Sequence, residues 1–149
     1  MPECPHRPPC PGCPRFGEPG IPAVAVEALA TLARDAGLAP PRCVEGPAFG
    51  YRHRARLAVR GRATSPKIGI FQEDSHRIVD IPRCLVHHPL VNTVAAALRD
   101  ALRATGVPPY AERPHRGVLR YLQVVVERTS GRAQVVLVAN GAEPTAVTG

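Results

Sequence analysis

The chain has 149 residues, 44% of them apolar, so we expect a folded domain with a hydrophobic core, and the length argues against two full domains. Its formal net charge is +7, and arginine supplies every basic residue except Lys67, which favours a polyanionic partner, either nucleic acid or an anionic membrane. A GC-rich genome also enriches arginine, so the positions of the arginines must decide between these interpretations. No segment approaches the ~18 apolar residues of a membrane span, and the amino terminus lacks the apolar run of a secretory signal, so we expect a cytoplasmic protein.

The first 21 residues form a loop rich in cysteine and proline. Eight of the 18 prolines lie within residues 1–22, which excludes a regular helix or a central strand there. From Pro22, a suitable first helical residue, the sequence predicts a helix that ends before Gly37. The apolar stripe of this helix consists of Val24, Ala28, Leu29, Leu32 and Ala36.

The pattern changes to a period of two from Tyr51 to Arg60, which predicts a half-buried strand. One face of this strand is strongly basic and carries Arg52, Arg54, Arg56, Ala58 and Arg60. Two short strands are predicted at 67–71 and 76–81, separated by turn-forming residues. Pro82 ends the second of them, and Cys84 follows on a loop.

Residues 89–105 give the strongest helix prediction in the chain. Pro89 suits the first turn, Gly106 ends the helix, and one face carries Val91, Val94, Leu98 and Leu102. Two further strands, 117–127 and 132–140, are joined by a hairpin-like connection at 128–131. This order predicts an α+β domain in which an antiparallel or mixed sheet is backed by helices. We expect three parts: a cluster-binding loop (1–21), a helix and linker (22–45) and a central domain (46–149).

Cys4, Cys10 and Cys13 have the spacing C-x5-C-x2-C, and Cys43 and Cys84 lie further along the chain. An odd number of cysteines in a cytoplasmic chain argues for metal ligation and against a disulfide framework. Three thiols in one proline-stiffened loop can converge on one centre, and a fourth from a distant loop would fasten that loop to the sheet. Three close cysteines with one remote favour a 4Fe–4S cluster. We prefer Cys84 as the fourth ligand because it follows a strand end, which leaves Cys43 as a free thiol.

Two other interpretations of the cysteines stay open. The loop could bind zinc, with His6, His87 or His88 supplying nitrogen ligands. Alternatively, the cysteines could be unrelated buried thiols.

The basic strand suggests the partner. Arg52, Arg54 and Arg56 project from one face at ~6.6 Å intervals, close to the phosphate spacing of an extended nucleic-acid strand. Guanidinium groups bind phosphates bidentately and stack on bases, so this row suits RNA. The alternative is a solvated outer sheet face, but the number of arginines and the neighbouring cysteine loop favour RNA.

The sequence also resembles a known family. Three segments look like the central region of the tRNA and rRNA (uracil-5-)-methyltransferases: FGYRHRARLAV (49–59), KIGIF to HRIVDIPRC (67–84) and HRGVLRYLQVVVE (115–127). The opening C-x5-C-x2-C, with 70 residues between Cys13 and Cys84, is similar to the 4Fe–4S ligand layout of that family. Some members carry an amino-terminal β-barrel RNA-binding module, for which the few residues ahead of Cys4 leave no room. In this respect the chain is similar to the shorter members of the family, which methylate 23S rRNA.

The resemblance implies a role for several residues. The cluster ligands would be Cys4, Cys10, Cys13 and Cys84, whereas Cys43 has no role in the pattern. The RNA-facing residues would be Arg52, Arg54 and Arg56, with Arg116 and Arg120 as further contacts. The expected partner is RNA, with 23S rRNA favoured over tRNA, and the chain is expected to be a monomer that does not bind membranes.

In such enzymes a cysteine attacks C6 of the uracil, a carboxylate assists, and S-adenosylmethionine (SAM) supplies the methyl group. These parts belong to a doubly wound α/β domain, which we expect beyond residue 149, because the chain has no Gly-rich dinucleotide-type turn and no cysteine in a catalytic context. The sequence therefore predicts no catalytic and no SAM-binding residue in this chain, which is expected to be inactive alone.

We interpret the chain as the amino-terminal, cluster- and RNA-binding part of an RNA (uracil-5-)-methyltransferase, whose helix at 22–36 packs on the missing domain. A free-standing, zinc-stapled nucleic-acid-binding module is the main alternative. An electron-transfer protein of the ferredoxin kind is a third, less suited to a basic, arginine-striped sheet.

Overall fold

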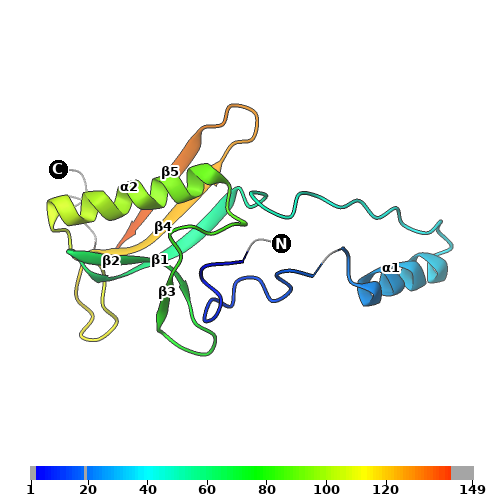
Figure 1. The fold of residues 1–149 in the computed structure, drawn as a ribbon, viewed down its shortest axis with the longest axis horizontal. Coiled ribbons are helices and arrows are strands. Elements are labelled where there is room, and N and C mark those ends of the chain that lie inside the picture. The colour runs from blue at the N-terminus through cyan, green and yellow to red at the C-terminus, as the bar shows by residue number, and fades with distance from the viewer. Residues whose placement is uncertain (1–2, 19, 142–149) are drawn as a thin grey trace. The chain divides into compact units, whose positions relative to one another are not determined.

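A computed structural model describes residues 3–18 and 20–141, so the end of the predicted central domain, residues 142–149, lies outside the described residues. The described residues form two compact units: one contains residues 15–18 and 20–47, and the larger one contains residues 3–14 and 48–141. The larger unit contains a five-stranded sheet with strand order β3-β2-β1-β4-β5, in which all neighbouring strands are antiparallel (Figure 1). The predicted α+β class is confirmed, and the sheet is the antiparallel form. Its strands are β1 (Arg54–Arg62), β2 (Ser65–Phe71), β3 (Ile78–Asp80), β4 (Leu119–Val126) and β5 (Ala133–Ala139).

The register of the central strands separates two faces of the sheet. On one face Leu57 of β1 pairs with Leu122 of β4, and Val59 pairs with Ile68 of β2. All four side chains are at most 2% exposed, so they form the centre of the core. Burying aliphatic side chains of this size contributes roughly 1.5–3 kcal/mol each. The opposite face, which we call the outer face, carries Arg54, Arg56 and Ala58, with their β4 partners Val125, Gln123 and Tyr121.

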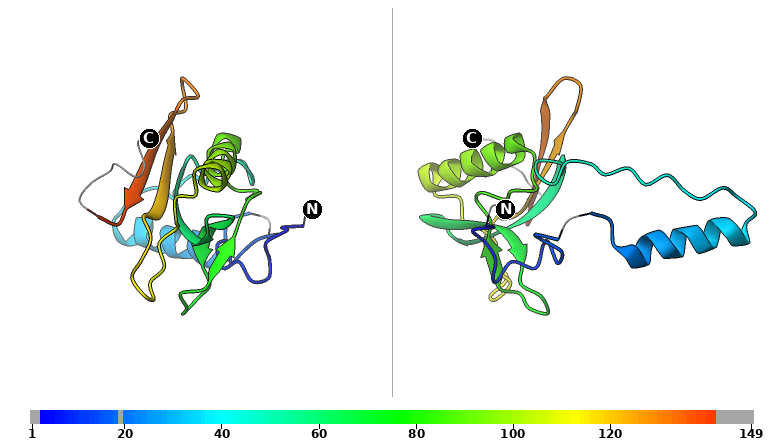
Figure 2. Two further views of the ribbon diagram at one scale, coloured as in Figure 1. Left: turned by 90° about the vertical axis from the view of Figure 1, so that its left-hand side faces the viewer. Right: turned by 45° about the vertical axis from the view of Figure 1, so that its right-hand side comes forward.

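Helix α2 (Pro89–Thr105) covers the core face of the sheet, as both views in Figure 2 show. Its bounds agree with the sequence prediction: Pro89 occupies the first turn, and Gly106 adopts a left-handed conformation with φ +72° at the carboxyl end. The side chain of His88 accepts a hydrogen bond from the Leu90 N–H and caps the other end. The buried residues of the helix are Val91, Ala95, Arg99 and Leu102.

Arg99 is an arginine on the buried side of α2. Its Nη2 lies 2.8 Å from Oδ1 of Asp80 on β3, and the same oxygen accepts a hydrogen bond from the Ile68 N–H. This ion pair joins the helix to the short edge strand. Because a buried guanidinium needs a partner, the pair keeps α2 in place over β2 and β3.

The basic strand begins later than its alternating pattern predicts. β1 starts at Arg54, whereas Arg52 pairs with the segment ahead of α2. The Arg52 N–H donates to the Val86 carbonyl at 2.8 Å, and the Arg52 carbonyl accepts from the His88 N–H at 3.0 Å. The start of the predicted strand therefore leaves the sheet and lines the loop that follows Cys84.

Helix α1 (Ala23–Asp35) lies in the smaller unit, close to the bounds predicted for it. None of its residues is buried, and Val24 and Leu32 from the predicted apolar stripe are 74% and 65% exposed. Gly37 follows with φ +67°, consistent with the predicted stop. Across the described residues, no helix has the length and apolar character needed to cross a membrane.

Candidate metal centre and nucleic-acid interface

The cysteine loop at residues 3–14 folds onto the sheet. Within the loop, the Cys10 N–H donates to the His6 carbonyl at 2.8 Å, and the Arg7 guanidinium donates to the Cys13 carbonyl. Gly12 lies against β2, where a Cβ atom would meet Cδ1 of Ile70 at 3.1 Å. Cys10 packs against the hydrophobic core, so the loop is held by apolar contact as well as by its own turns.

Cys84 lies on a second loop that is tied to the first. The Arg83 N–H donates to Nε2 of His6 at 3.2 Å, which links two segments 77 residues apart. The Cys84 carbonyl accepts from the Asn92 side chain of α2 at 3.0 Å, and Cys84 itself packs against the core. The loop that carries three of the predicted ligands and the loop that carries the fourth are therefore neighbours.

The four thiols also influence one another electrostatically. Burial raises the pKa of the Cys13 thiol, the nearby Cys84 thiol raises it further, and Cys10 and Cys4 add to this effect, whereas the Arg52 guanidinium lowers it. In the described part of the chain, however, no three Cys, His, Asp or Glu side chains stand in positions that would ligate a metal ion. The structure thus gathers the four predicted thiols without closing them on a common centre. Cys43 is exposed and belongs to the other unit.

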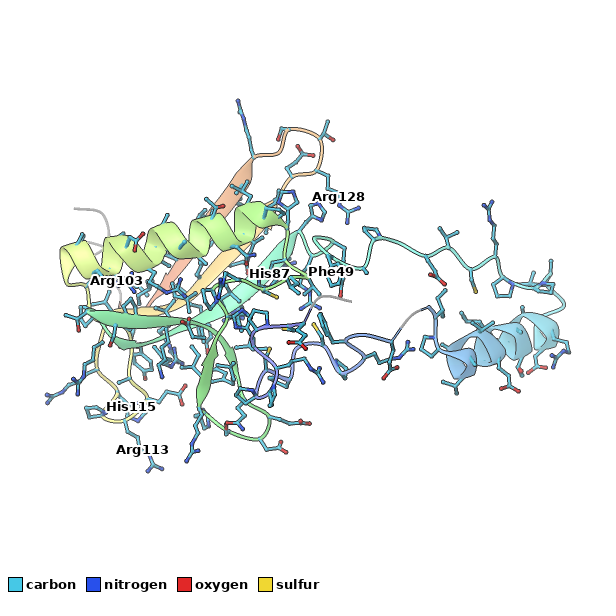
Figure 3. The ribbon with its side chains drawn as sticks, viewed as in Figure 1. Phe49, His87, Arg103, Arg113, His115 and Arg128 are labelled. Carbon is cyan, nitrogen blue, oxygen red and sulfur yellow. The ribbon has the colours of Figure 1, made fainter. Side chains whose placement is uncertain are left out.

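Three histidines are the predicted alternative nitrogen ligands: His6, His87 and His88. His6 accepts the Arg83 hydrogen bond, and the His88 ring lies 4.8 Å from the His53 ring. His87, labelled in Figure 3, is 5% exposed, and its Nδ1 atom is buried without a hydrogen-bond partner among the described residues. Burial lowers the pKa of His87, a hydrogen bond with Asn92 opposes this, and the charges of Arg52 and His6 lower it further. Because buried polar atoms are rarely left unpaired, the free Nδ1 atom of His87 is a position that a bound group would satisfy.

On the outer face, two of the predicted RNA-facing arginines are free to meet a ligand. Arg54 and Arg56 are exposed on β1. The Arg56 guanidinium lies over the Tyr121 ring of β4, 4.6 Å from its centroid. A flat guanidinium on an aromatic ring is a platform on which a nucleobase can stack. Arg52 is exposed too, but it lies outside the strand, and its charge acts on Cys13 and His87.

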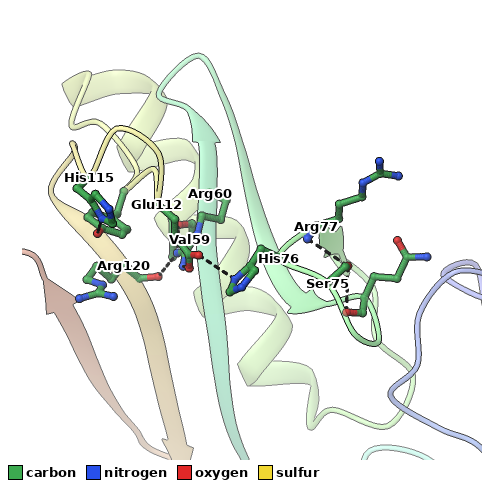
Figure 4. A network of polar contacts seen from close by, with 10 residues as sticks. Val59, Arg60, Ser75, His76, Arg77, Glu112, His115 and Arg120 are labelled. Carbon is green, nitrogen blue, oxygen red and sulfur yellow. Dashed lines mark hydrogen bonds and ion pairs between the residues drawn. The ribbon is translucent and has the colours of Figure 1, made fainter.

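At the end of β1 near Arg60, the basic face is buried instead of exposed. Arg60, which the alternating pattern places on the same face, is only 7% exposed. Its guanidinium lies within 6 Å of the centroids of three rings, those of Phe71, Tyr110 and Tyr121. It also donates to Oε1 of Glu112 at 2.9 Å and to the Arg120 carbonyl at 3.0 Å (Figure 4). The exposed basic face predicted from Tyr51 to Arg60 is therefore shorter, and Arg60 is part of a structural cluster.

The remaining two predicted contacts differ from each other. Arg120 is half-buried, its guanidinium lies 4.5 Å from the Tyr110 centroid, and its Nε atom is buried without a hydrogen-bond partner in the described residues. Arg116 is exposed on the loop before β4.

Sequence reasoning missed the cluster around Arg60. The register of β4 shifts between Leu119 and Tyr121, so Arg120 is the extra residue of a β-bulge. The spacing of Leu119 and Leu122 indicates this bulge. Residues three apart cannot both face the core in a regular strand, yet both leucines are buried. Glu112 and His76, which come from two separate loops, gave no such signal.

No family model matches the sequence. The chain is 46% identical over 96 residues to an uncharacterized RNA methyltransferase of Protochlamydia amoebophila, an alignment that covers 64% of this chain and 25% of that protein. It is 40% identical over 88 residues to an uncharacterized RNA methyltransferase of Geobacter sulfurreducens, covering 59% and 18%. The chain is therefore similar to one part of proteins named RNA methyltransferases. It spans a quarter or less of the length of these relatives.

The fold of this chain has a solved counterpart. It resembles the crystal structure of Pyrococcus abyssi tRNA (uracil-54, C5)-methyltransferase in complex with S-adenosyl-L-homocysteine, with a TM-score of 0.61 and 24% identity. The match covers 80% of this chain and 29% of that one. The named relatives confirm the predicted resemblance to RNA methyltransferases, and the solved neighbour shows a shared fold.

Proposed function

We propose that this chain is the iron–sulfur- and RNA-binding part of a SAM-dependent RNA (uracil-5-)-methyltransferase. The observation that supports this most is the position of the cysteine loop, which lies against the same sheet that exposes Arg54 and Arg56. Relatives named RNA methyltransferases give the substrate class, and the fold neighbour, a uracil-C5 enzyme, suggests the reaction.

The cluster would be held by Cys4, Cys10, Cys13 and Cys84. Soft thiolates without a hard oxygen ligand suit a 4Fe–4S cluster. A cluster bound there would fasten the amino-terminal loop to the sheet, a structural task, because methylation of uracil requires no electron. The residues of this chain contribute the support: His6 joins the two loops, and Cys10 and Cys84 anchor them in the core.

Catalysis itself is assigned to the rest of such an enzyme. There a cysteine would attack uracil C6, a carboxylate would assist, and SAM would donate the methyl group. The exposed apolar stripe of α1 suits packing against that part, since an isolated helix gains little stability from propensity alone. Purified alone with SAM and RNA, the chain is expected to show no methyl transfer, and measurable transfer would contradict this assignment.

The RNA partner is proposed to be 23S rRNA, as the sequence resemblance implies. The fold neighbour acts on tRNA, so the two substrates need a direct comparison. Competition between a 23S rRNA fragment and a bulk tRNA for the chain is expected to favour the rRNA. A preference for tRNA would overturn this choice while leaving RNA binding intact.

Metal analysis after anaerobic purification tests the cluster. About four iron with sulfide per chain, and a brown colour, are expected. About one zinc in a colourless sample would instead support a zinc-stapled nucleic-acid-binding module, which the unpaired nitrogen of buried His87 favours as the second candidate. The Cys84→Ser variant is expected to lose metal and to expose residues 1–20 to proteases, whereas Cys43→Ser, the matched control, should do neither.

A further inference from the structure

The loop between α2 and β4 folds into a tight hairpin with a basic tip. Ala111 and Arg116 exchange backbone hydrogen bonds of 2.7 and 3.2 Å. Gly117 closes the loop with φ +103°, where a Cβ atom would meet the Pro109 carbonyl oxygen at 2.2 Å, so only glycine fits. Arg113 and Arg116 at the tip are exposed and have no ion-pair partner among the described residues.

The one carboxylate of this loop is directed inward. Glu112 places Oε1 2.9 Å from Nη2 of Arg60 and Oε2 2.8 Å from Nδ1 of His76, so it joins the loop to β1 and to the β2–β3 turn (Figure 4). Tyr110, 6% exposed, packs at the base of the loop, and its hydroxyl lies 3.0 Å from Nδ1 of His115. The loop is therefore anchored at its base, and the two arginines at its tip remain exposed.

The basic tip continues the surface that Arg54 and Arg56 begin. Arg56 and Arg60 both lie over the Tyr121 ring, at 4.6 and 5.4 Å from its centroid. At about 3.3 Å per residue, Arg60 lies about 13 Å beyond Arg56 along β1. At that point the loop covers β1, so that Arg60 is buried while Arg113 and Arg116 of the loop are exposed. Figure 3 shows Arg113 and His115 on this loop, on the side of the sheet away from α2.

We propose that residues 111–116 are a second RNA-contacting element, which binds phosphates of the same RNA strand a few nucleotides beyond those held by Arg54 and Arg56. The inference rests on the proposed RNA-binding function. The bound segment is an extended single strand, because the platform of Arg56 on Tyr121 receives unpaired bases and the loop blocks the straight path along β1. Arg113 and Arg116 supply the charge, and Glu112 is a positioning residue.

The test compares two double variants of equal net charge. Arg113→Ala/Arg116→Ala removes the tip charges, and Arg103→Ala/Arg128→Ala removes two exposed arginines, one on α2 and one in the β4–β5 turn (Figure 3). Binding of a fluorescent single-stranded RNA is measured over a range of salt concentrations. The tip variant is expected to bind roughly tenfold more weakly, with a log–log salt slope smaller by about 1.4, the effect of two lost phosphate contacts. The control should remain close to wild type.

Two further measurements separate the possible failures. Arg113→Lys/Arg116→Lys keeps the charge and should retain most of the salt slope, whereas a fold defect would remove it. Equal affinities and slopes for the tip variant and the control, while the wild type binds RNA, would overturn the loop proposal alone. Failure of the wild-type chain to bind RNA would overturn the proposed RNA-binding function and this inference with it.

Discussion

Arg56 and Arg60 lie on the same face of β1, four residues apart, and both touch the ring of Tyr121, yet they have opposite surroundings. Arg56 is exposed and has no carboxylate partner among the described residues. Arg60 is 7% exposed, surrounded by three aromatic rings and paired with Glu112. The same residue type on one strand face is thus exposed at one end, where we propose that it binds RNA, and buried in a structural cluster at the other.

The difference arises from a loop that is distant in sequence. The pleat of the strand determines which face a side chain occupies, but the exposure of that face depends on what covers it. Residues 110–112 cover only the end of β1 near Arg60. Substitutions at the two ends should therefore separate stability from RNA binding.

The largest effect is expected at the covered end. Arg60→Ala removes the partner of Glu112 and the cation between the rings, so the free energy of unfolding should fall by about 3 kcal/mol. Urea denaturation followed by circular dichroism measures this. Arg56→Ala should stay within about 0.5 kcal/mol of wild type. Similar losses for both variants would remove the distinction between the two ends.

At the exposed end, the effect should appear in binding. Arg54→Ala/Arg56→Ala is expected to weaken single-stranded RNA binding roughly tenfold and to flatten the salt dependence, because two phosphate contacts are lost. Titrations by fluorescence anisotropy at several salt concentrations measure both quantities. An unchanged salt slope would mean that these arginines face solvent only.

A smaller effect is expected for the carboxylate that joins the loop to β1. The hydrogen bond from Arg60 lowers the pKa of Glu112, and the charge of His76 lowers it further. A carboxyl group with a lowered folded-state pKa stabilises the fold above its ordinary value near 4.5, and this stability is lost as the pH falls through the lowered pKa. Glu112→Gln should lower the free energy of unfolding by about 1 kcal/mol at neutral pH. The free energy of unfolding of this variant should also fall less than that of the wild type when the pH is lowered. Parallel acid denaturation curves for the two proteins would contradict this.

The smallest effect is expected for Glu127, a carboxylate whose hydrogen bonds come from its own turn and not from an arginine. Glu127 in the β4–β5 turn accepts hydrogen bonds from the Thr129 and Ser130 backbone N–H groups, and hydrogen bonding around this turn, with Ser130 the main contributor, lowers its pKa from 4.5 to about 2. The contribution of Glu127 to the stability of the fold is present above pH 4.5 and is lost as the pH falls from that value to about 2. A carboxyl NMR titration should give a midpoint near 2, and a midpoint near 4.5 would show that the turn does not hold the carboxylate.

Local sequence patterns predicted the elements that depend on local physics. Helix α2 has its predicted bounds because a proline start, a glycine stop and an apolar stripe agree. The cysteine spacing predicted a group of four thiols, and the structure brings Cys4, Cys10, Cys13 and Cys84 near one another. Whether they ligate a cluster stays a prediction.

Most of the missed features depend on contacts between distant segments. Arg99 and Asp80 form a buried pair between a helix and a strand, and Arg52 leaves the strand pattern because it pairs with the loop after Cys84. The bulge at Arg120 shifts a strand register. Alternation along one strand carries no information about such partners, so the cover over Arg60 could not be predicted from β1 alone.

Photo-cross-linking of a thiouridine-containing single-stranded RNA to the intact chain, mapped by mass spectrometry, tests most directly whether the outer face of the sheet binds RNA. Cross-links are expected in peptides that contain Arg54–Arg56, Tyr121 and the 111–116 loop, and not in those of α2. Cross-links concentrated on α2, or none at all under conditions of saturating RNA, would contradict an RNA-binding outer face.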